Sequence, residues 1–161
     1  MAGSKSSSKG AAFELLIAKA VLKQFPGFTE EDCHRTPKSG GHPYESSSDL
    51  RLSPEFRKVF PYAVECKHHK DFKIGQMWPK PSALVLSWLL QTEKAAKEEG
   101  RIPILVMRGN FTPIYVALPA DPSIFGYKQH ITLEIDDGRL QHSFWAVLPF
   151  EDWISSLPNL Q

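Results

Sequence analysis

Residues 62–67 read Tyr-Ala-Val-Glu-Cys-Lys, which is the pattern of a β-strand that carries two charged side chains. Successive side chains of a strand point to opposite faces, so Glu65 and Lys67 should lie side by side on one face while Cys66 points to the other. A carboxylate and a lysine are costly to bury in a sheet unless they pair or bind something. The segment therefore predicts both a strand and a polar site built on it.

The residues just upstream predict a second strand. Residues 49–52 alternate polar and apolar side chains, as a half-buried strand does, and a Ser-Pro pair follows them. We expect this strand to form a hairpin with residues 62–66, through a turn at about 54–61. The pairing would place Asp49 on the strand next to Glu65.

Two amphipathic helices are predicted, at 9–25 and at about 81–99. In the first, apolar side chains recur every three or four residues, Ser8 is a plausible N-cap, and a Pro-Gly pair stops the run. In the second, Pro81 suits the first turn and Gly100 suits the position just past the end.

The remaining chain predicts several shorter elements. The candidates are strands at 33–36, 102–107, 114–118, 131–135 and 144–148, and a short helix at 150–157. This order of helices and strands favours an α/β fold with a mixed central β-sheet flanked by helices. We expect a single domain over residues 9–161, preceded by a flexible basic tail at residues 1–8.

The composition fits one globular domain, because 42% of the 161 residues are hydrophobic and 23% are charged. No apolar run approaches the ~20 residues of a membrane span, and the N-terminus lacks the apolar centre of a signal peptide. The only cysteines, Cys33 and Cys66, form no Cys-x-x-Cys pair, so we expect a reducing, cytoplasmic setting. Residues 1–80 hold 13 Lys and Arg against 9 Asp and Glu, so this half carries the positive charge that could attract a polyanion.

Asp49, Glu65 and the main-chain carbonyl of Cys66 could form half of a magnesium shell. Mg²⁺ prefers oxygen ligands, usually one or two carboxylates with waters and substrate phosphate. The ion would lower the pKa of a bound water and offset charge on a phosphate, and Lys67 could orient or deprotonate that water or neutralise the phosphate. Glu14 flanks the apolar stripe of the first helix and could reach the same place. Taken singly, the Glu-x-Lys triplet also fits an exposed ion pair, and Glu14 fits an ordinary surface glutamate.

Four short motifs follow one another between residues 9 and 118. They are Lys9-Gly10-Ala11-Ala12-Phe13-Glu14, then Ser39-Gly40-Gly41 leading to Asp49-Leu50, then Glu65-Cys66-Lys67, and then Gly100-Arg101-Ile102-Pro103-Ile104-Leu105. In this order they resemble the PD-(D/E)XK nuclease superfamily and, within it, the archaeal-type Holliday junction resolvases. The resemblance implies a restriction-endonuclease-like fold.

The resemblance also implies a role for each matched residue. Asp49, Glu65 and the Cys66 carbonyl would bind Mg²⁺, with Mn²⁺ as a substitute, Glu14 would lie in the outer shell, and Lys67 would be catalytic. The implied activity is endonucleolytic cleavage of branched DNA, above all a four-way junction, that leaves 5′-phosphate ends. A four-way junction has two-fold symmetry, so a homodimer is expected. The resemblance indicates a phage or archaeal source.

Further DNA contacts are predicted from positive charge and from the matched loop. The candidates are Lys9, Ser39, Gly40, His42, His68, Lys70, Lys73 and Lys80. The lysines that follow Glu65 lie close together, although a solvated surface loop would show the same pattern. The loop at 36–48, rich in Ser, Gly and Pro, should be mobile and close over DNA near the cut, or else be only a surface connection.

Some alternatives stay open from the sequence alone. Gln91, within the otherwise apolar second helix, is either a polar residue near the active site or a core amide. Trp78, in the basic stretch, is a candidate for stacking on bases. The chain could also be a restriction-like or repair nuclease that acts on duplex DNA, or a non-catalytic DNA-binding subunit with the same fold. The presence of all four functional positions together favours an active enzyme.

Overall fold

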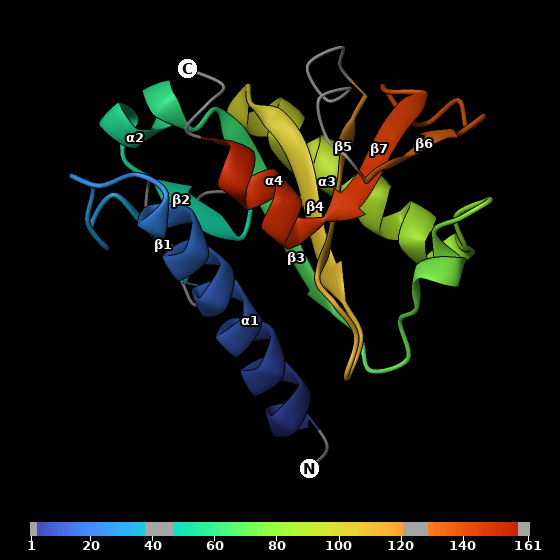
Figure 1. Cartoon of the computed structure of the whole chain (residues 1–161), viewed down its shortest axis with the longest axis horizontal. Coiled ribbons are helices and arrows are strands. Elements are labelled where there is room, and N and C mark those ends of the chain that lie inside the picture. Colours follow the sequence, from blue (N-terminus) through green and yellow to red (C-terminus); the bar gives the residue numbers. More distant parts are fainter. Residues whose placement is uncertain (1–2, 38–46, 121–128, 158–161) are drawn as a thin grey trace.

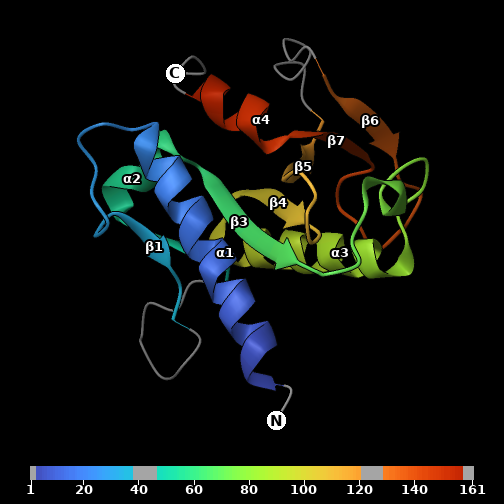
Figure 2. The same ribbon diagram turned by 60° about the horizontal axis from the view of Figure 1, so that its bottom comes forward.

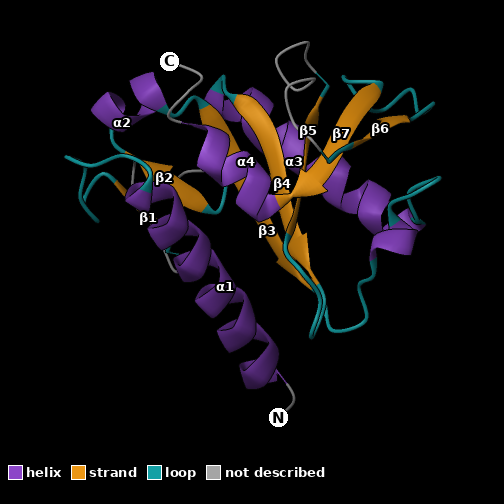
Figure 3. Cartoon of the chain, in the orientation of Figure 1, coloured by secondary structure: helices purple, strands orange, loops and turns teal. Residues whose placement is uncertain are grey.

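The computed structural model describes residues 3–37, 47–120 and 129–157, and its centre is a five-stranded sheet (Figure 1). The strand order is β3-β4-β5-β7-β6, in which β3 and β4 are parallel and the other neighbours are antiparallel. The strands are β3 (Tyr62–His68), β4 (Ile102–Arg108), β5 (Tyr115–Pro119), β6 (Ile131–Glu134) and β7 (Phe144–Pro149). Figure 3 shows helices on both sides of this sheet. The mixed sheet flanked by helices confirms the predicted α/β fold.

The parallel pair of β3 and β4 is joined by a crossover helix, α3 (Ala83–Glu99). Ser82 caps its first turn by accepting a hydrogen bond from the Val85 N–H at 3.3 Å. Gly100 ends it in the left-handed conformation, with a φ of 63° that favours glycine. Both ends follow from local sequence, although Pro81 precedes the cap instead of lying in the first turn.

Helices cover both faces of the sheet, each over its own apolar cluster. On one face lie α1 (Gly3–Lys23) and α4 (Phe150–Ser156), and on the other lies α3 (Figures 1 and 2). Val64 and Ile104 pack on the α1 side, whereas Leu105 and Met107 pack on the α3 side. Because side chains alternate between the two faces along β3, Cys66 lies in the apolar cluster under α1, and Glu65 and Lys67 face α3.

The predicted hairpin between residues 49–52 and 62–66 is wrong. Strand β2 (Leu50–Leu52) pairs antiparallel with β1 (Cys33–Arg35) in a separate two-stranded sheet. The connection to β3 is a helix, α2 (Pro54–Val59), because Ser53 caps its first turn by accepting from the Phe56 N–H at 3.2 Å. A helix of this length carries the chain away from the tight return that a hairpin needs.

The predicted N-cap at Ser8 is also wrong, because α1 begins at Gly3. Residues 3–8 were expected to form a flexible tail, and they are helical here. Serine and lysine do not break a helix, and an N-cap contributes only about 1 kcal/mol, so a Ser-rich run can continue the helix instead of starting it. The N-terminal half of α1 projects past the sheet on the side where β3 ends (Figure 2). Among the described residues, no helix is both long and apolar enough to cross a membrane.

Candidate active site

The site lies along the outer edge of β3, which is the terminal strand of the sheet. Asp49, immediately before β2, is bound to this edge through two hydrogen bonds. Its N–H donates to the Val64 carbonyl at 2.9 Å, and its Oδ2 accepts from the Cys66 N–H at 2.7 Å. The N–H and C=O of one strand residue point to the same side, so the Cys66 carbonyl is directed toward the edge that carries Asp49.

A closed triangle of polar side chains lies next to this edge, on the face that α3 covers. Lys67 Nζ is 3.0 Å from Glu65 Oε1 and donates to Gln91 Oε1 at 2.9 Å. Gln91 Nε2 donates to the same Glu65 Oε1 at 2.8 Å. Gln91 therefore contacts the polar site and is not a core amide. Glu65 is buried at 3% relative exposure, yet the triangle uses only one of its oxygens.

Glu14 approaches the same strand from α1 on the other face. Its side chain is buried and pairs with Arg35 of β1, with Arg35 Nε 3.1 Å from Glu14 Oε2. Burial, together with the negative charges of Asp49, Glu14 and Glu65, raises the pKa of the Cys66 thiol well above its usual range. The negative charges of Asp49, Glu14 and Glu65 therefore all act on Cys66, a residue of β3.

The donor set fits a hard cation that keeps open coordination positions. Asp49, Glu65 and the Cys66 carbonyl are oxygen donors, as Mg²⁺ and Mn²⁺ prefer. Within residues 3–37, 47–120 and 129–157, no group of three or more His, Cys, Asp or Glu side chains is arranged to hold a metal. Two carboxylates and one carbonyl would therefore need water and substrate phosphate to complete the shell, which is the usual situation for magnesium.

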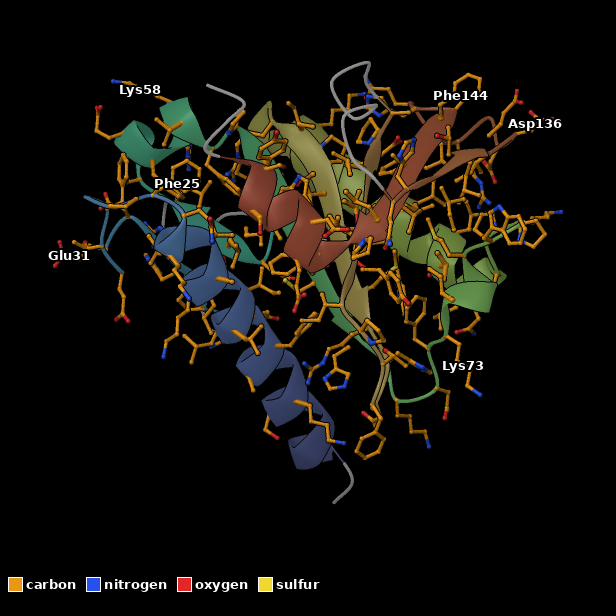
Figure 4. The ribbon with its side chains drawn as sticks, in the orientation of Figure 1. Phe25, Glu31, Lys58, Lys73, Asp136 and Phe144 are labelled. Carbon is orange, nitrogen blue, oxygen red and sulfur yellow. The ribbon has the colours of Figure 1, made fainter. Side chains whose placement is uncertain are left out.

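Several of the predicted DNA-binding side chains lie on the side of the molecule where β3 ends. Lys70, Lys73 and Lys80 are exposed in the connection from β3 to α3, which includes the short helix η1 (Ile74–Gln76). Figure 4 labels Lys73 near the end of β3. Lys9 is exposed in the N-terminal half of α1, and His68 Nε2 lies 3.0 Å from Asn110 Oδ1.

The predicted contacts Ser39, Gly40 and His42 lie outside the described residues. The two ends of their loop are described, and they meet beside Asp49. The Thr36 N–H donates to the Asp49 carbonyl at 2.7 Å, and Thr36 Oγ1 donates to the Ser48 carbonyl at 2.9 Å. The loop thus begins and ends next to the candidate site.

Sequence reasoning missed the turn that follows β4. Arg108 places its guanidinium 5.1 Å from the centre of the Phe13 ring, and Asn110 contacts His68. The short polar run that follows a buried strand was the available signal, but a turn of this kind has no characteristic spacing. The contact of Arg35 was also not predicted, because its partner, Glu14, lies on α1 and is distant in the sequence.

The fold and the site together define a class of protein. A mixed sheet that carries an aspartate beside a Glu-x-Lys strand, with a glutamate on the preceding helix, is the arrangement of the PD-(D/E)XK nucleases. Residues 5–159 match the family described as "Phage putative PDDEXK endonuclease", and the chain belongs to this family. Comparison with curated proteins and with solved structures gives no match.

Proposed function

We propose that this protein is a DNA endonuclease that hydrolyses phosphodiester bonds with a divalent cation, Mg²⁺ or Mn²⁺. Asp49, Glu65 and the Cys66 carbonyl hold the ion, Glu14 lies in its outer shell, and Lys67 is catalytic. The observation that carries the proposal is the hydrogen bond from the Cys66 N–H to Asp49 Oδ2 at 2.7 Å, which joins the aspartate to the strand of Glu65 and Lys67. The family match over residues 5–159 supports the same activity.

The chain's own residues supply positioning and charge. A bound cation supplies positive charge that acidifies water and offsets charge on the phosphate. Lys67 Nζ, held by Glu65 and Gln91, orients the attacking water or neutralises the phosphate. Gln91 fixes the angle of the lysine, and Arg35 holds Glu14 in place.

The proposed substrate is branched DNA, in particular a four-way junction, cut by a homodimer to leave 5′-phosphate ends. The support is the resemblance to the archaeal-type resolvases, whose motifs recur in order from Lys9 to Leu105. Exposed lysines on α1 and on the β3–α3 connection supply the positive surface that a DNA backbone requires. A junction offers two equivalent strands, which a symmetric dimer can engage together.

A cleavage assay with three substrates tests the proposal. We expect wild-type protein in Mg²⁺ to cut a four-way junction faster than a flap or a linear duplex of matched sequence, and Glu65→Gln to cut none of them. Equal cleavage of the duplex would instead support a restriction-like or repair nuclease. Binding without any cleavage above the Glu65→Gln background, in Mg²⁺ or in Mn²⁺, would identify a non-catalytic DNA-binding subunit and contradict the proposal.

A further inference from the structure

Phe111, in the turn between β4 and β5, points entirely into solvent. Its relative exposure is 107%, against 52% for Phe144 and Trp78. It is also the one residue other than glycine, among those described, with a positive φ, at 59°. A left-handed conformation is unusual for a bulky residue, and such positions cluster where a protein meets a ligand.

The turn that presents Phe111 is held on both sides. The Gly109 N–H donates to Thr112 Oγ1 at 2.8 Å, and the Asn110 N–H donates to the Lys70 carbonyl at 3.3 Å. A Cβ atom on Gly109 would lie 2.1 Å from the Phe72 carbonyl oxygen, so the turn packs directly against the β3–α3 connection. The ring therefore projects from an anchored base.

The residues next to Phe111 in the turn are polar, and the turn contacts the connection that carries the exposed lysines. Asn110 and Thr112 flank it in sequence, and Asn110 contacts both His68 and the backbone of Lys70. A single aromatic ring in a basic surface suits a nucleic acid, whose bases offer flat faces beside a charged backbone. A protein partner would need a wider apolar area.

The turn is also close to the candidate active site. His68 follows Lys67 and pairs with Arg108, and Phe111 lies three residues beyond Arg108. At about 3.3 Å per residue and about 4.8 Å between strands, the Phe111 backbone lies within about 20 Å of Lys67. That span corresponds to about six nucleotide steps along a strand.

We propose that Phe111 is a wedge that inserts into the base stack of the DNA within about six nucleotides of the cut. The inference rests on the proposed nuclease function and deepens it, because it selects DNA whose bases are already unstacked or easily unstacked, as at a branch point. Unstacking is least costly at such places, so the wedge favours branched over continuous duplex DNA.

The test uses Glu65→Gln protein in EDTA, bound to a four-way junction that carries thymines on both sides of the cut. We expect permanganate, which attacks unstacked thymines, to modify one or two of them more strongly than in the free junction. Glu65→Gln/Phe111→Ala should lose this increase over the free junction and bind the junction about 5- to 150-fold more weakly, the effect of one lost stacking contact. Phe111→Trp, which keeps a ring, should retain both the reactivity and the affinity.

The matched control is Phe144→Ala in the same background. Phe144 is also exposed, but Figure 4 labels it at the start of β7, at the opposite end of the molecule from the β4–β5 turn. It should keep the permanganate pattern and the affinity. Urea denaturation should give unchanged stability for Phe111→Ala, because the ring contacts only solvent.

The experiments distinguish an error in the wedge proposal from an error in the proposed nuclease function. If wild-type protein cuts DNA, while Phe111→Ala leaves the affinity and the permanganate pattern unchanged, then the wedge is wrong and the nuclease function stands. If Phe111→Ala removes the permanganate reactivity but wild-type protein never cuts, then the wedge stands and the nuclease function is wrong. Absence of DNA binding would overturn both.

Discussion

Two buried glutamates, Glu65 on β3 and Glu93 on α3, have different kinds of hydrogen-bond partner. Glu93 accepts from the N–H groups of Gln141 and His142 at 2.6 and 2.9 Å, and its Oε1 lies 2.9 Å from His142 Nδ1. Both of its oxygens are thus engaged, and they bind α3 to the turn that leads into β7. Glu65 has its contacts with Lys67 and Gln91 on Oε1 alone.

The comparison shows that burial does not separate a structural carboxylate from one that we propose to bind a metal, since Glu65 and Glu93 are 3% and 8% exposed. The partners do. Backbone donors engage both oxygens of Glu93 and fix its position. The partners of Glu65 are side chains with ionic or amide ends, and Asp49 lies on the adjacent edge, so this carboxylate can exchange partners during a reaction.

The largest expected effect comes from matched substitutions of these two residues. Glu65→Gln should reduce cleavage by about 10³-fold or more, because a ligand worth several kcal/mol of charge stabilisation is lost. Its free energy of unfolding should change by about 1 kcal/mol or less, because Lys67 reaches solvent and repulsion from Asp49 is relieved. Single-turnover cleavage and urea denaturation give both numbers.

Glu93→Gln should show the reverse behaviour. The amide replaces one accepting oxygen, so the protein should lose about 1–3 kcal/mol of stability while its cleavage rate at low temperature stays within about two-fold of wild type. A loss of cleavage as large as that of Glu65→Gln in a folded protein would abolish the distinction.

The next largest effect is expected for Lys67, which contacts Glu65. Lys67→Ala should lower the cleavage rate by about 10²- to 10⁴-fold, the contribution of a positioned acid–base group. Metal binding, measured by calorimetry, should persist, because the oxygen ligands remain. If metal binding disappeared while cleavage stayed high, the lysine would serve only to hold Glu65.

A smaller effect concerns DNA affinity. Replacing Lys70, Lys73 and Lys80 together by Ala should reduce the steepness of the slope of log K for DNA binding against log salt concentration by up to about 2.7. Each lost phosphate contact removes about 0.9 from that slope. The control is a second triple variant with the same change in charge, Lys58→Ala, Lys94→Ala and Lys97→Ala, at exposed positions of α2 and α3. Equal slopes for the two variants would locate the DNA-binding surface elsewhere.

Local patterns predicted most of the fold. The alternation at residues 62–67 and the end of α3 at Gly100 depend only on neighbours along the chain, and the structure has them as expected, whereas the start of α3 lies at Ser82 and not at Pro81. The pairing of β2 depends on which distant strand offers a free edge, and local sequence contains no such information. The hairpin was therefore wrong, although Asp49 still reaches β3 through the Val64 carbonyl.

The sequence also predicted part of the candidate site. Glu65 and Lys67 are neighbours because they share a strand face, which alternation alone dictates. The sequence left Gln91 ambiguous, because the helix phase relative to the sheet depends on packing. Phe111 was not found, because its exposure depends on how the Gly109 turn packs against Phe72. Sequence reasoning chose Trp78 instead, from its position between lysines.

We expect a divalent cation to bind between Asp49 and Glu65, and Mn²⁺ can locate this site without any reaction. In an NMR titration of the 18.2 kDa protein, paramagnetic Mn²⁺ should broaden the amide signals of residues 49 and 65–67 first. The signals of Glu93 and His142 should persist, and Asp49→Asn should require far more Mn²⁺ for the same broadening. Broadening centred elsewhere, or unchanged by Asp49→Asn, would contradict the claim.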